Sequence, residues 1–155
     1  MYSNKLICDI LDYIDININK EISIEELSNL FFFDRYYIMK LFKKELNITI
    51  INYIKSMRVY NSLKDYKYNN QIIRIALNNG FNSLEYYSET FKEIVKISPR
   101  EYKHFLKRNN KISFDKIITT SISISNLQFI KDKAINYKNN RPPEKTKIKT
   151  LTIFK

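Results

Sequence analysis

Apolar side chains recur at the spacing of an α-helix through the first third of the chain. Residues 4–17 carry one apolar face and are predicted to form an amphipathic first helix. This face comprises Leu6, Ile7, Ile10, Leu11 and Ile14. Ser23 is followed three residues later by Glu26, and this capping-box pattern predicts a second helix near residues 24–31. Asp34 then predicts the N-cap of a third helix.

A longer helix follows, and then the same pattern starts again. Thr49 predicts the cap of a helix over about residues 50–65, and a later short apolar helix ends at Gly80, the only glycine of the chain. Glycine adopts positive φ at little cost, so Gly80 is expected in a sharp turn between two helices. Ser83 predicts the next cap, and Ser98-Pro99 predicts the start of a seventh helix.

The two halves of this pattern form an internal repeat with an offset of 49 residues. Three identical pairs support the alignment: Tyr37 with Tyr86, Phe42 with Phe91 and Lys43 with Lys92. Each copy is a short helix, a turn and a second helix, which is the helix-turn-helix pattern whose second helix enters a DNA major groove. We therefore expect an all-α fold of seven helices. Two helix-turn-helix units, at about 22–46 and 71–95, are joined by the helix at about 50–65.

These helices are expected to form one domain over residues 1–110, followed by a basic C-terminal extension over residues 111–155. Ile alternates with Ser or Thr over residues 118–125, and residues 146–154 alternate similarly, so the extension is predicted to contain short β-strands. The extension is either a hairpin packed on the helices or a truncated effector domain. The domain has a net charge of +4, from 17 Lys and Arg against 13 Asp and Glu, and the extension +7, from 10 against 3.

Composition excludes several classes of function. The net charge of +11 favours a polyanionic partner such as nucleic acid, although an AT-rich genome also enriches lysine. Cys8 and His104 are the only residues of their types, so we predict no disulfide, no metal, no cofactor and no catalytic residues. We find neither a signal peptide nor a run of about 20 apolar residues that could span a bilayer, and we therefore expect a cytoplasmic protein without membrane contact.

The second half of the repeat contains the most distinctive motif of the chain. It reads Ile72-x-x-Ile75-Ala76-x-x-x-Gly80-Phe81-x-Ser83, then Tyr87-Ser88-x-x-Phe91-Lys92, then Ser98-Pro99-x-x-Tyr102-Lys103. In order and spacing this motif resembles the signature of the AraC-type (AraC/XylS) transcription regulators. The resemblance covers about residues 4–105 and implies a DNA-binding domain with two helix-turn-helix units. Asn47 and Lys96 stand where the family usually has glycine, and because lysine adopts positive φ less readily than asparagine, the turn near Lys96 is expected to be built differently.

The resemblance implies that exposed side chains of the third helix contact DNA. These side chains are Arg35, Tyr36, Met39, Lys40 and Lys43. Lys40 is expected to donate to guanine, Tyr36 and Met39 to contact thymine methyl groups, and Lys43 to meet a phosphate. The alternative is an ordinary solvated basic face.

The corresponding residues of the sixth helix are more acidic. They are Leu84, Glu85, Ser88, Glu89 and Lys92. Glu89 accepts a hydrogen bond from cytosine N4, or the second unit docks weakly and leaves the first to hold the site, or Glu89 pairs with Lys92 on a face that does not read bases. The sequence leaves these alternatives open. Arg58 is expected to be structural and to bridge the two units, for example through a carboxylate; the alternative is a DNA contact. Gly80 and Pro99 are also expected to be structural.

The function expected from this resemblance is sequence-specific transcription regulation, with two reading helices in adjacent major grooves. The expected partners are double-stranded DNA and RNA polymerase, and the chain is expected to act as a monomer or weak dimer; no effector can be named. The alternative is an interaction protein acting on RNA polymerase or another regulator with weak or no specific DNA binding, which Glu85 and Glu89 motivate. The lysines of the extension are expected to add non-specific affinity for phosphates, or to be merely solvated. They include Lys131, Lys133, Lys138, Lys145, Lys147 and Lys149.

Overall fold

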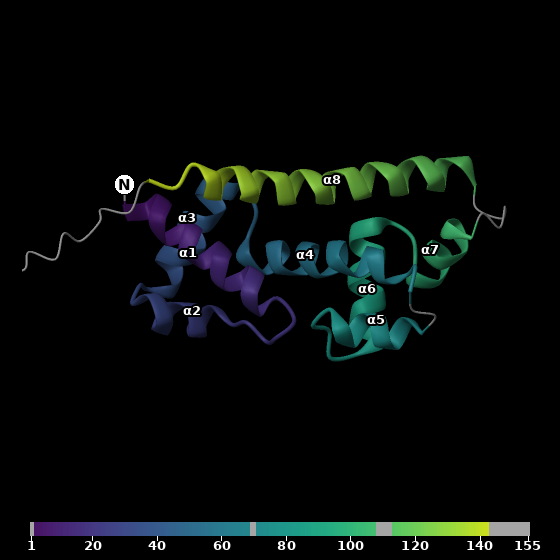
Figure 1. The fold of residues 1–155 in the computed structure, drawn as a ribbon, viewed down its shortest axis with the longest axis horizontal. Coiled ribbons are helices and arrows are strands. Elements are labelled where there is room, and N and C mark those ends of the chain that lie inside the picture. The colour runs from purple at the N-terminus through teal and green to yellow at the C-terminus, as the bar shows by residue number, and fades with distance from the viewer. Residues whose placement is uncertain (1, 69–70, 108–112, 143–155) are drawn as a thin grey trace, which may run out of the picture.

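The computed structural model describes residues 2–68, 71–107 and 113–142, and every regular element in them is an α-helix. The helices are α1 (Tyr2–Asn17), α2 (Ile24–Phe31), α3 (Arg35–Leu46), α4 (Ile50–Asp65), α5 (Ile72–Asn78), α6 (Leu84–Val95), α7 (Pro99–Leu106) and α8 (Phe114–Asn139). We call α1–α3 the first unit and α5–α7 the second unit; α4 connects them (Figure 1). The predicted all-α fold with two helix-turn-helix units is confirmed.

Side-chain caps begin five of these helices at the residues that the sequence predicts. Each capping oxygen accepts a hydrogen bond from a backbone N–H in the first turn, where the helix offers no partner of its own. The capping residues are Ser23, Asp34, Thr49, Ser83 and Ser98. Two of them form reciprocal capping boxes, with Glu26 on α2 and with Glu101 on α7, and Pro99 occupies the start of α7. Local chemistry therefore places these helix starts.

The internal repeat of the sequence is also a repeat of the backbone. α3 and α6 are both 12 residues long. Asn47 ends α3 with φ +58° and Lys96 ends α6 with φ +73°, and each cap N–H donates to the carbonyl four residues earlier. The expectation that the turn near Lys96 is built differently is therefore wrong. The exposed Lys96 keeps the left-handed turn because Ile97, which is 1% exposed, and the cap Ser98 follow it directly and fix the path of the chain.

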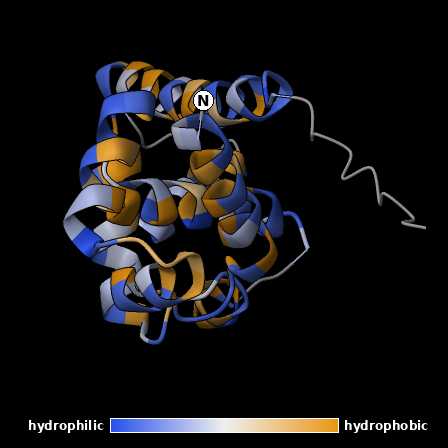
Figure 2. Cartoon of the chain, turned by 90° about the vertical axis from the view of Figure 1, so that its left-hand side faces the viewer, coloured by the Kyte–Doolittle hydropathy of each residue, from blue (hydrophilic) through white to orange (hydrophobic). Residues whose placement is uncertain are grey.

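The two units have apolar cores of different composition. The first is largely aliphatic, with Ile10, Leu11 and Ile14 of α1 completely buried against Leu27 and Ile38. The second is largely aromatic, with neighbouring ring centroids about 5 to 6 Å apart. Its rings include Phe81, Tyr87, Phe91 and Tyr102. Apolar and polar residues alternate around the helices, so each helix contributes an apolar side to the packing (Figure 2).

The helix α8 is the largest departure from the prediction. The strand predicted over residues 118–125 is wrong because these residues belong to α8, and the strand predicted over 146–154 lies outside the described residues. The alternation misleads because α8 has apolar residues on its outer side as well as its inner side: Ile118 and Ile122 are exposed, whereas Thr120 is completely buried. No single apolar face therefore marks the segment as a helix.

Three hydroxyl groups of α8 are satisfied within the helix itself, whereas the buried Thr120 hydroxyl has no hydrogen-bond partner among the described residues. Thr119, Ser121 and Ser123 each donate a hydrogen bond of 2.8 to 2.9 Å to the carbonyl four residues earlier. Such bonds satisfy the hydroxyl group within the helix, so Ser and Thr can occupy positions in a helix. A run that reads as a strand in the sequence is thus folded as helix.

α8 lies along both units and forms one long edge of the molecule (Figure 1). It packs against α4, α6 and α1. Leu127 of α8 is buried in the core of the second unit and Ala134 in the core of the first. The described part of the extension is therefore a helix packed on the domain rather than a hairpin.

Candidate nucleic-acid interface

The helix α3 is fixed to the first unit by its apolar side and its cap. Ile38 and Phe42 are completely buried, and the Asp34 carboxylate accepts from the N–H groups of Tyr36 and Tyr37 at 2.9 and 3.4 Å. Leucines at positions 41 and 46 complete the buried side. The opposite side of α3 is thereby held toward solvent.

All five residues of α3 that the sequence analysis proposes for DNA contact lie on this solvent side. Arg35, Tyr36, Met39, Lys40 and Lys43 are exposed, and Tyr36 is 75% exposed. In the part of the chain that the structure describes, none of the three cations forms an ion pair. The surface therefore offers free cationic donors next to an aromatic ring and a thioether, which suit phosphates, base edges and thymine methyl groups.

The corresponding surface of α6 is narrower and more acidic. Glu85, Glu89 and Lys92 are exposed, whereas Ser88 and Leu84 are half-buried, and Leu84 packs against the core of the second unit. Among the described residues, Glu89 and Lys92 form no ion pair with each other. The two carboxylates on this face are therefore open to an external donor.

A cation near α6 comes from α4, a feature that the sequence analysis missed. The Lys55 Nζ lies 5.7 Å from the centroid of the Tyr86 ring, within the range of a cation–π contact. Tyr86 is 39% exposed and its ring also contacts Phe81 at 5.7 Å between centroids. The only sequence signal was the identity of Tyr86 with Tyr37 in the repeat; nothing in the sequence placed Lys55 beside it.

Arg58 and Gly80 form a direct contact between the two units. The Arg58 Nε donates to the carbonyl of Ile18 at 2.8 Å, and its terminal nitrogen donates to the carbonyl of Lys20. Gly80 has φ +83°, and a Cβ on it would lie 2.8 Å from the Ile18 oxygen and 2.9 Å from the Arg58 Nε. The partners of Arg58 are thus backbone carbonyls of the α1–α2 loop rather than the expected carboxylate. Burial lowers the pKa of this guanidinium.

Several lysines of the extension are engaged within the molecule. Lys138 forms ion pairs with Asp12 and Asp15 of α1, and the Lys131 Nζ lies 4.5 Å from the centroid of the Tyr60 ring. Lys133 is half-buried beside α3 and α4. Lys145, Lys147 and Lys149 lie outside the described residues. Part of the basic excess of the extension therefore neutralises acidic residues of α1.

Other kinds of site find no support within residues 2–68, 71–107 and 113–142. No three His, Cys, Asp or Glu side chains gather there as they would around a metal ion. No helix of these segments is both long enough and apolar enough to cross a membrane. The exposed faces of α3 and α6 are therefore the candidate site.

A family model described as a helix-turn-helix domain matches residues 27–104, which is half of the chain. The matched stretch begins within α2 and ends within α7, so it contains both candidate reading helices. The chain belongs to the AraC-type helix-turn-helix family. The matched stretch is accordingly a DNA-binding domain of the kind found in transcription regulators.

Similar proteins match about two thirds of this chain. The uncharacterised HTH-type transcriptional regulator YbfP of Bacillus subtilis is 30% identical over 109 residues, which are 70% of this chain and 37% of YbfP. The transposon Tn10 TetD protein of Escherichia coli is 26% identical over 103 residues, which are 66% of this chain and 75% of TetD. This chain thus spans little more than a third of YbfP but most of TetD.

A solved structure shows the same fold. The C-terminal domain of AraT, a response regulator from Geobacillus stearothermophilus, has a TM-score of 0.63 at 19% identity. The match covers 70% of this chain and 92% of that domain. The AraC-type arrangement of two helix-turn-helix units is therefore common to both.

Proposed function

We propose that the protein is a sequence-specific DNA-binding transcription regulator that places α3 and α6 in two successive major grooves on one face of the duplex. The observation that carries this proposal is the exposed face of α3, where three cations without an ion-pair partner among the described residues lie beside Tyr36 and Met39. The buried side of α3 packs against the first unit. The second helix of a helix-turn-helix unit is the one that enters the groove. Half-sites one helical turn apart lie about 34 Å from each other along the duplex.

The side chains of α3 divide into positioning and reading roles. Lys40 is central on the exposed face and is proposed to donate to guanine O6 and N7. Tyr36 and Met39 are proposed to contact thymine methyl groups, while Arg35 and Lys43 hold phosphates. This division predicts that Lys40 affects base preference, whereas Lys43 affects affinity for all sequences alike.

The helix α6 is proposed to contact bases although its exposed face is mostly acidic and adds little electrostatic attraction to DNA. Glu89 is exposed and unpaired among the described residues, so it can accept a hydrogen bond from cytosine N4. Lys55 of α4 lies beside this helix at Tyr86 and supplies a cation that can meet a nearby phosphate. The first unit would therefore contribute most of the electrostatic affinity, and the second would add sequence preference.

A second candidate function follows from the same acidic face. Glu85 and Glu89 repel phosphate, and an exposed acidic helix suits a basic protein surface such as one on RNA polymerase or another regulator. In this alternative the chain keeps the fold but binds DNA weakly or without sequence preference. In either case we propose a cytoplasmic, non-enzymatic protein that works as a monomer or weak dimer.

The test is selection of bound sequences from a random duplex pool, repeated with Lys40→Ala. We expect the full chain to enrich one motif, and Lys40→Ala to lose about 1–3 kcal/mol of specific affinity and to relax one base position. Lys5→Ala is the matched control, since Lys5 is an exposed lysine of α1 and belongs to neither reading helix. The proposal fails if no motif is enriched and affinity does not fall with salt, which would favour the interaction protein.

A further inference from the structure

One end of α8 is tied to the second unit. The Lys116 Nζ lies 2.9 Å from the Glu101 carboxylate, which also caps α7. Further along α8, Leu127 is 1% exposed in the core of that unit. The Lys116 ammonium and the N–H of Ser98 lower the pKa of Glu101 to about 2, so the carboxylate stays charged through the physiological range.

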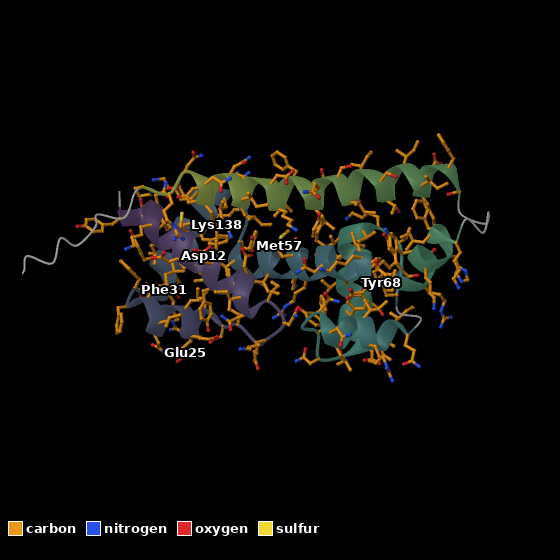
Figure 3. The ribbon with its side chains drawn as sticks, in the orientation of Figure 1. Asp12, Glu25, Phe31, Met57, Tyr68 and Lys138 are labelled. Atoms are coloured by element: carbon orange, nitrogen blue, oxygen red, sulfur yellow. The ribbon has the colours of Figure 1, made fainter. Side chains whose placement is uncertain are left out.

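The other end of α8 is tied to the first unit by a cluster of opposite charges. Asp12 and Asp15 of α1 form ion pairs with Lys138, and Arg141 forms ion pairs with Asp12 and Asp9. Figure 3 shows Lys138 and Asp12 side by side at this end. We call these five residues the charge clamp. Three carboxylates about one helical turn apart on α1 thus face one cation in the last turn of α8 and one just beyond its end.

Three further contacts join α8 to α3 and α4. The Tyr137 hydroxyl donates to Glu45 near the end of α3 at 3.0 Å. In the middle of α8, Gln128 accepts a hydrogen bond from the Tyr60 hydroxyl of α4, and Lys131 lies over the same ring. α8 contacts α3 near the C-terminal end of α3, so α8 does not cover the exposed face of α3.

Without α8, the two units would be held less firmly relative to each other. α4 connects them covalently, and Arg58 with Gly80 forms a contact beside it. A second helix roughly alongside α4 and tied at both ends restricts bending and twisting between the units. This restriction has a consequence for DNA, because each added base pair moves a half-site by about 3.4 Å and turns it by about 35°.

We propose that α8 is a brace that fixes α6 relative to α3 and thereby sets which spacing of two DNA half-sites the protein accepts. α8 lies outside the family match of residues 27–104. The spacing consequence rests on the proposed function, whereas the mechanical role does not. Two measurements separate them.

The first measurement is the distance between nitroxide labels on Lys44→Cys and Glu93→Cys, two exposed positions that correspond in the repeat. Cys8 is completely buried and is left in place, and the parent chain serves to show that it takes up no label. We expect a narrow distance distribution in the parent chain, and a distribution at least about twice as broad when Asp12→Asn removes two of the four ion pairs of the clamp. Lys138→Gln removes two ion pairs from the other side and should broaden the distribution similarly.

The matched control for Asp12→Asn is Asp115→Asn. Asp115 is an exposed carboxylate on α8, and among the described residues its side chain forms no ion pair to another helix. The control removes the same charge and should leave the distribution narrow. An unchanged distribution in both clamp variants, with cooperative melting retained, overturns the brace whatever the protein does with DNA.

The second measurement is affinity for a set of duplexes in which the two halves of the selected motif are moved apart by one or two base pairs. We expect the parent chain and Asp115→Asn to lose at least about tenfold at the wrong spacing, and Asp12→Asn to lose about threefold or less. Equal spacing dependence in all three chains overturns the role of the brace in DNA reading. If no chain selects a motif while the clamp variants still broaden the label distance, the proposed function fails and the mechanical brace stands.

Discussion

The helices α3 and α6 share one backbone plan and carry charge of opposite sign on their exposed faces. α3 and α6 have the same length, begin behind the caps Asp34 and Ser83, and end in left-handed residues. At the offset of the repeat, Lys40 of α3 corresponds to Glu89 of α6, and both are exposed. Caps and turns thus specify the helices, while the outward positions between them are free to carry either sign of charge.

The cores of the two units differ in a related way. Ile38 of α3 corresponds to Tyr87 of α6, and both are completely buried. The Tyr87 hydroxyl lies 2.9 Å from that of Tyr66 and donates to Ser62 at 3.0 Å, and Ser62 donates to the carbonyl of Val59 at 2.7 Å. A hydrogen-bonded core depends on direction as well as volume, so we expect the second unit to tolerate substitution less well than the first.

The turns inside the two units give the largest expected difference in stability. Gly80 and Phe32 both have positive φ, but Phe32 is 92% exposed whereas Gly80 packs against the backbone of Ile18. Gly80→Ala adds left-handed strain and a clash with a backbone oxygen that cannot move away freely. We expect it to lower the free energy of unfolding by about 2–4 kcal/mol in urea denaturation.

The matched control is Phe32→Ala, which keeps a Cβ at a left-handed position that faces solvent. We expect it to change the free energy of unfolding by less than about 0.5 kcal/mol. A loss below about 1 kcal/mol for Gly80→Ala would show that the contact between the units yields easily, and that the two turns are equivalent after all.

The buried hydroxyl of Tyr87 is the next point of difference. Tyr87→Phe leaves Ser62 and Tyr66 with one partner fewer, and we expect a loss of about 1–2 kcal/mol in the free energy of unfolding. Tyr86→Phe is the control, because Tyr86 is 39% exposed and its hydroxyl is therefore open to water. Equal losses for both variants would mean that the network adds nothing beyond an ordinary tyrosine.

The same tyrosine predicts a pH dependence. Burial raises the pKa of Tyr87 to about 12, above the value of 10.0 for an unperturbed tyrosine. The folded state therefore retains the proton more strongly than the unfolded state. The corresponding stability is present below pH 10 and is lost as the pH rises from 10 to 12. Thermal melts across this range should show a smaller decline in melting temperature for Tyr87→Phe than for the parent chain. Parallel declines would show that Tyr87 is not a source of the pH dependence.

Glu89→Lys tests whether surface charge separates the DNA roles of the units. The substitution gives α6 the charge that α3 has at Lys40. If α6 lies in a groove, we expect the slope of log affinity against log salt to steepen by roughly 0.9 for each additional phosphate that the new lysine neutralises. Asp132→Lys on the exposed side of α8 makes the same charge change as a control. Equal slopes for the two variants would place α6 off the DNA.

The smallest expected effect concerns the residues that end α3 and α6. Lys96→Gly should raise the free energy of unfolding by about 0.5–1 kcal/mol, because glycine adopts the left-handed conformation without strain from a Cβ. Asn47→Gly should increase stability less, since asparagine already tolerates that conformation. Urea denaturation of both variants measures the difference. A loss of stability for Lys96→Gly would mean that the lysine side chain contributes interactions that outweigh its strain.

The chain's local chemistry was enough to predict its helix starts, its repeat and the exposure of the candidate residues on α3. A cap needs only an oxygen and an N–H two or three residues away, so Ser23, Asp34 and Ser83 reveal their helices in the sequence. The left-handed turn after α6 was not predictable in this way, because Lys96 has an unsuitable side chain and its path is imposed by the burial of Ile97.

Long-range packing, by contrast, decided α8 and everything that depends on it. Its sequence alternates apolar and hydroxyl residues, and it has no single apolar face that local rules could recognise. Its fold is set by partners such as Asp12, which is 129 residues from Arg141 in the sequence. The same is true of Lys55 beside Tyr86 and of Arg58 on the carbonyl of Ile18. Helix caps act within one turn, whereas these contacts exist only after separate helices have been brought together.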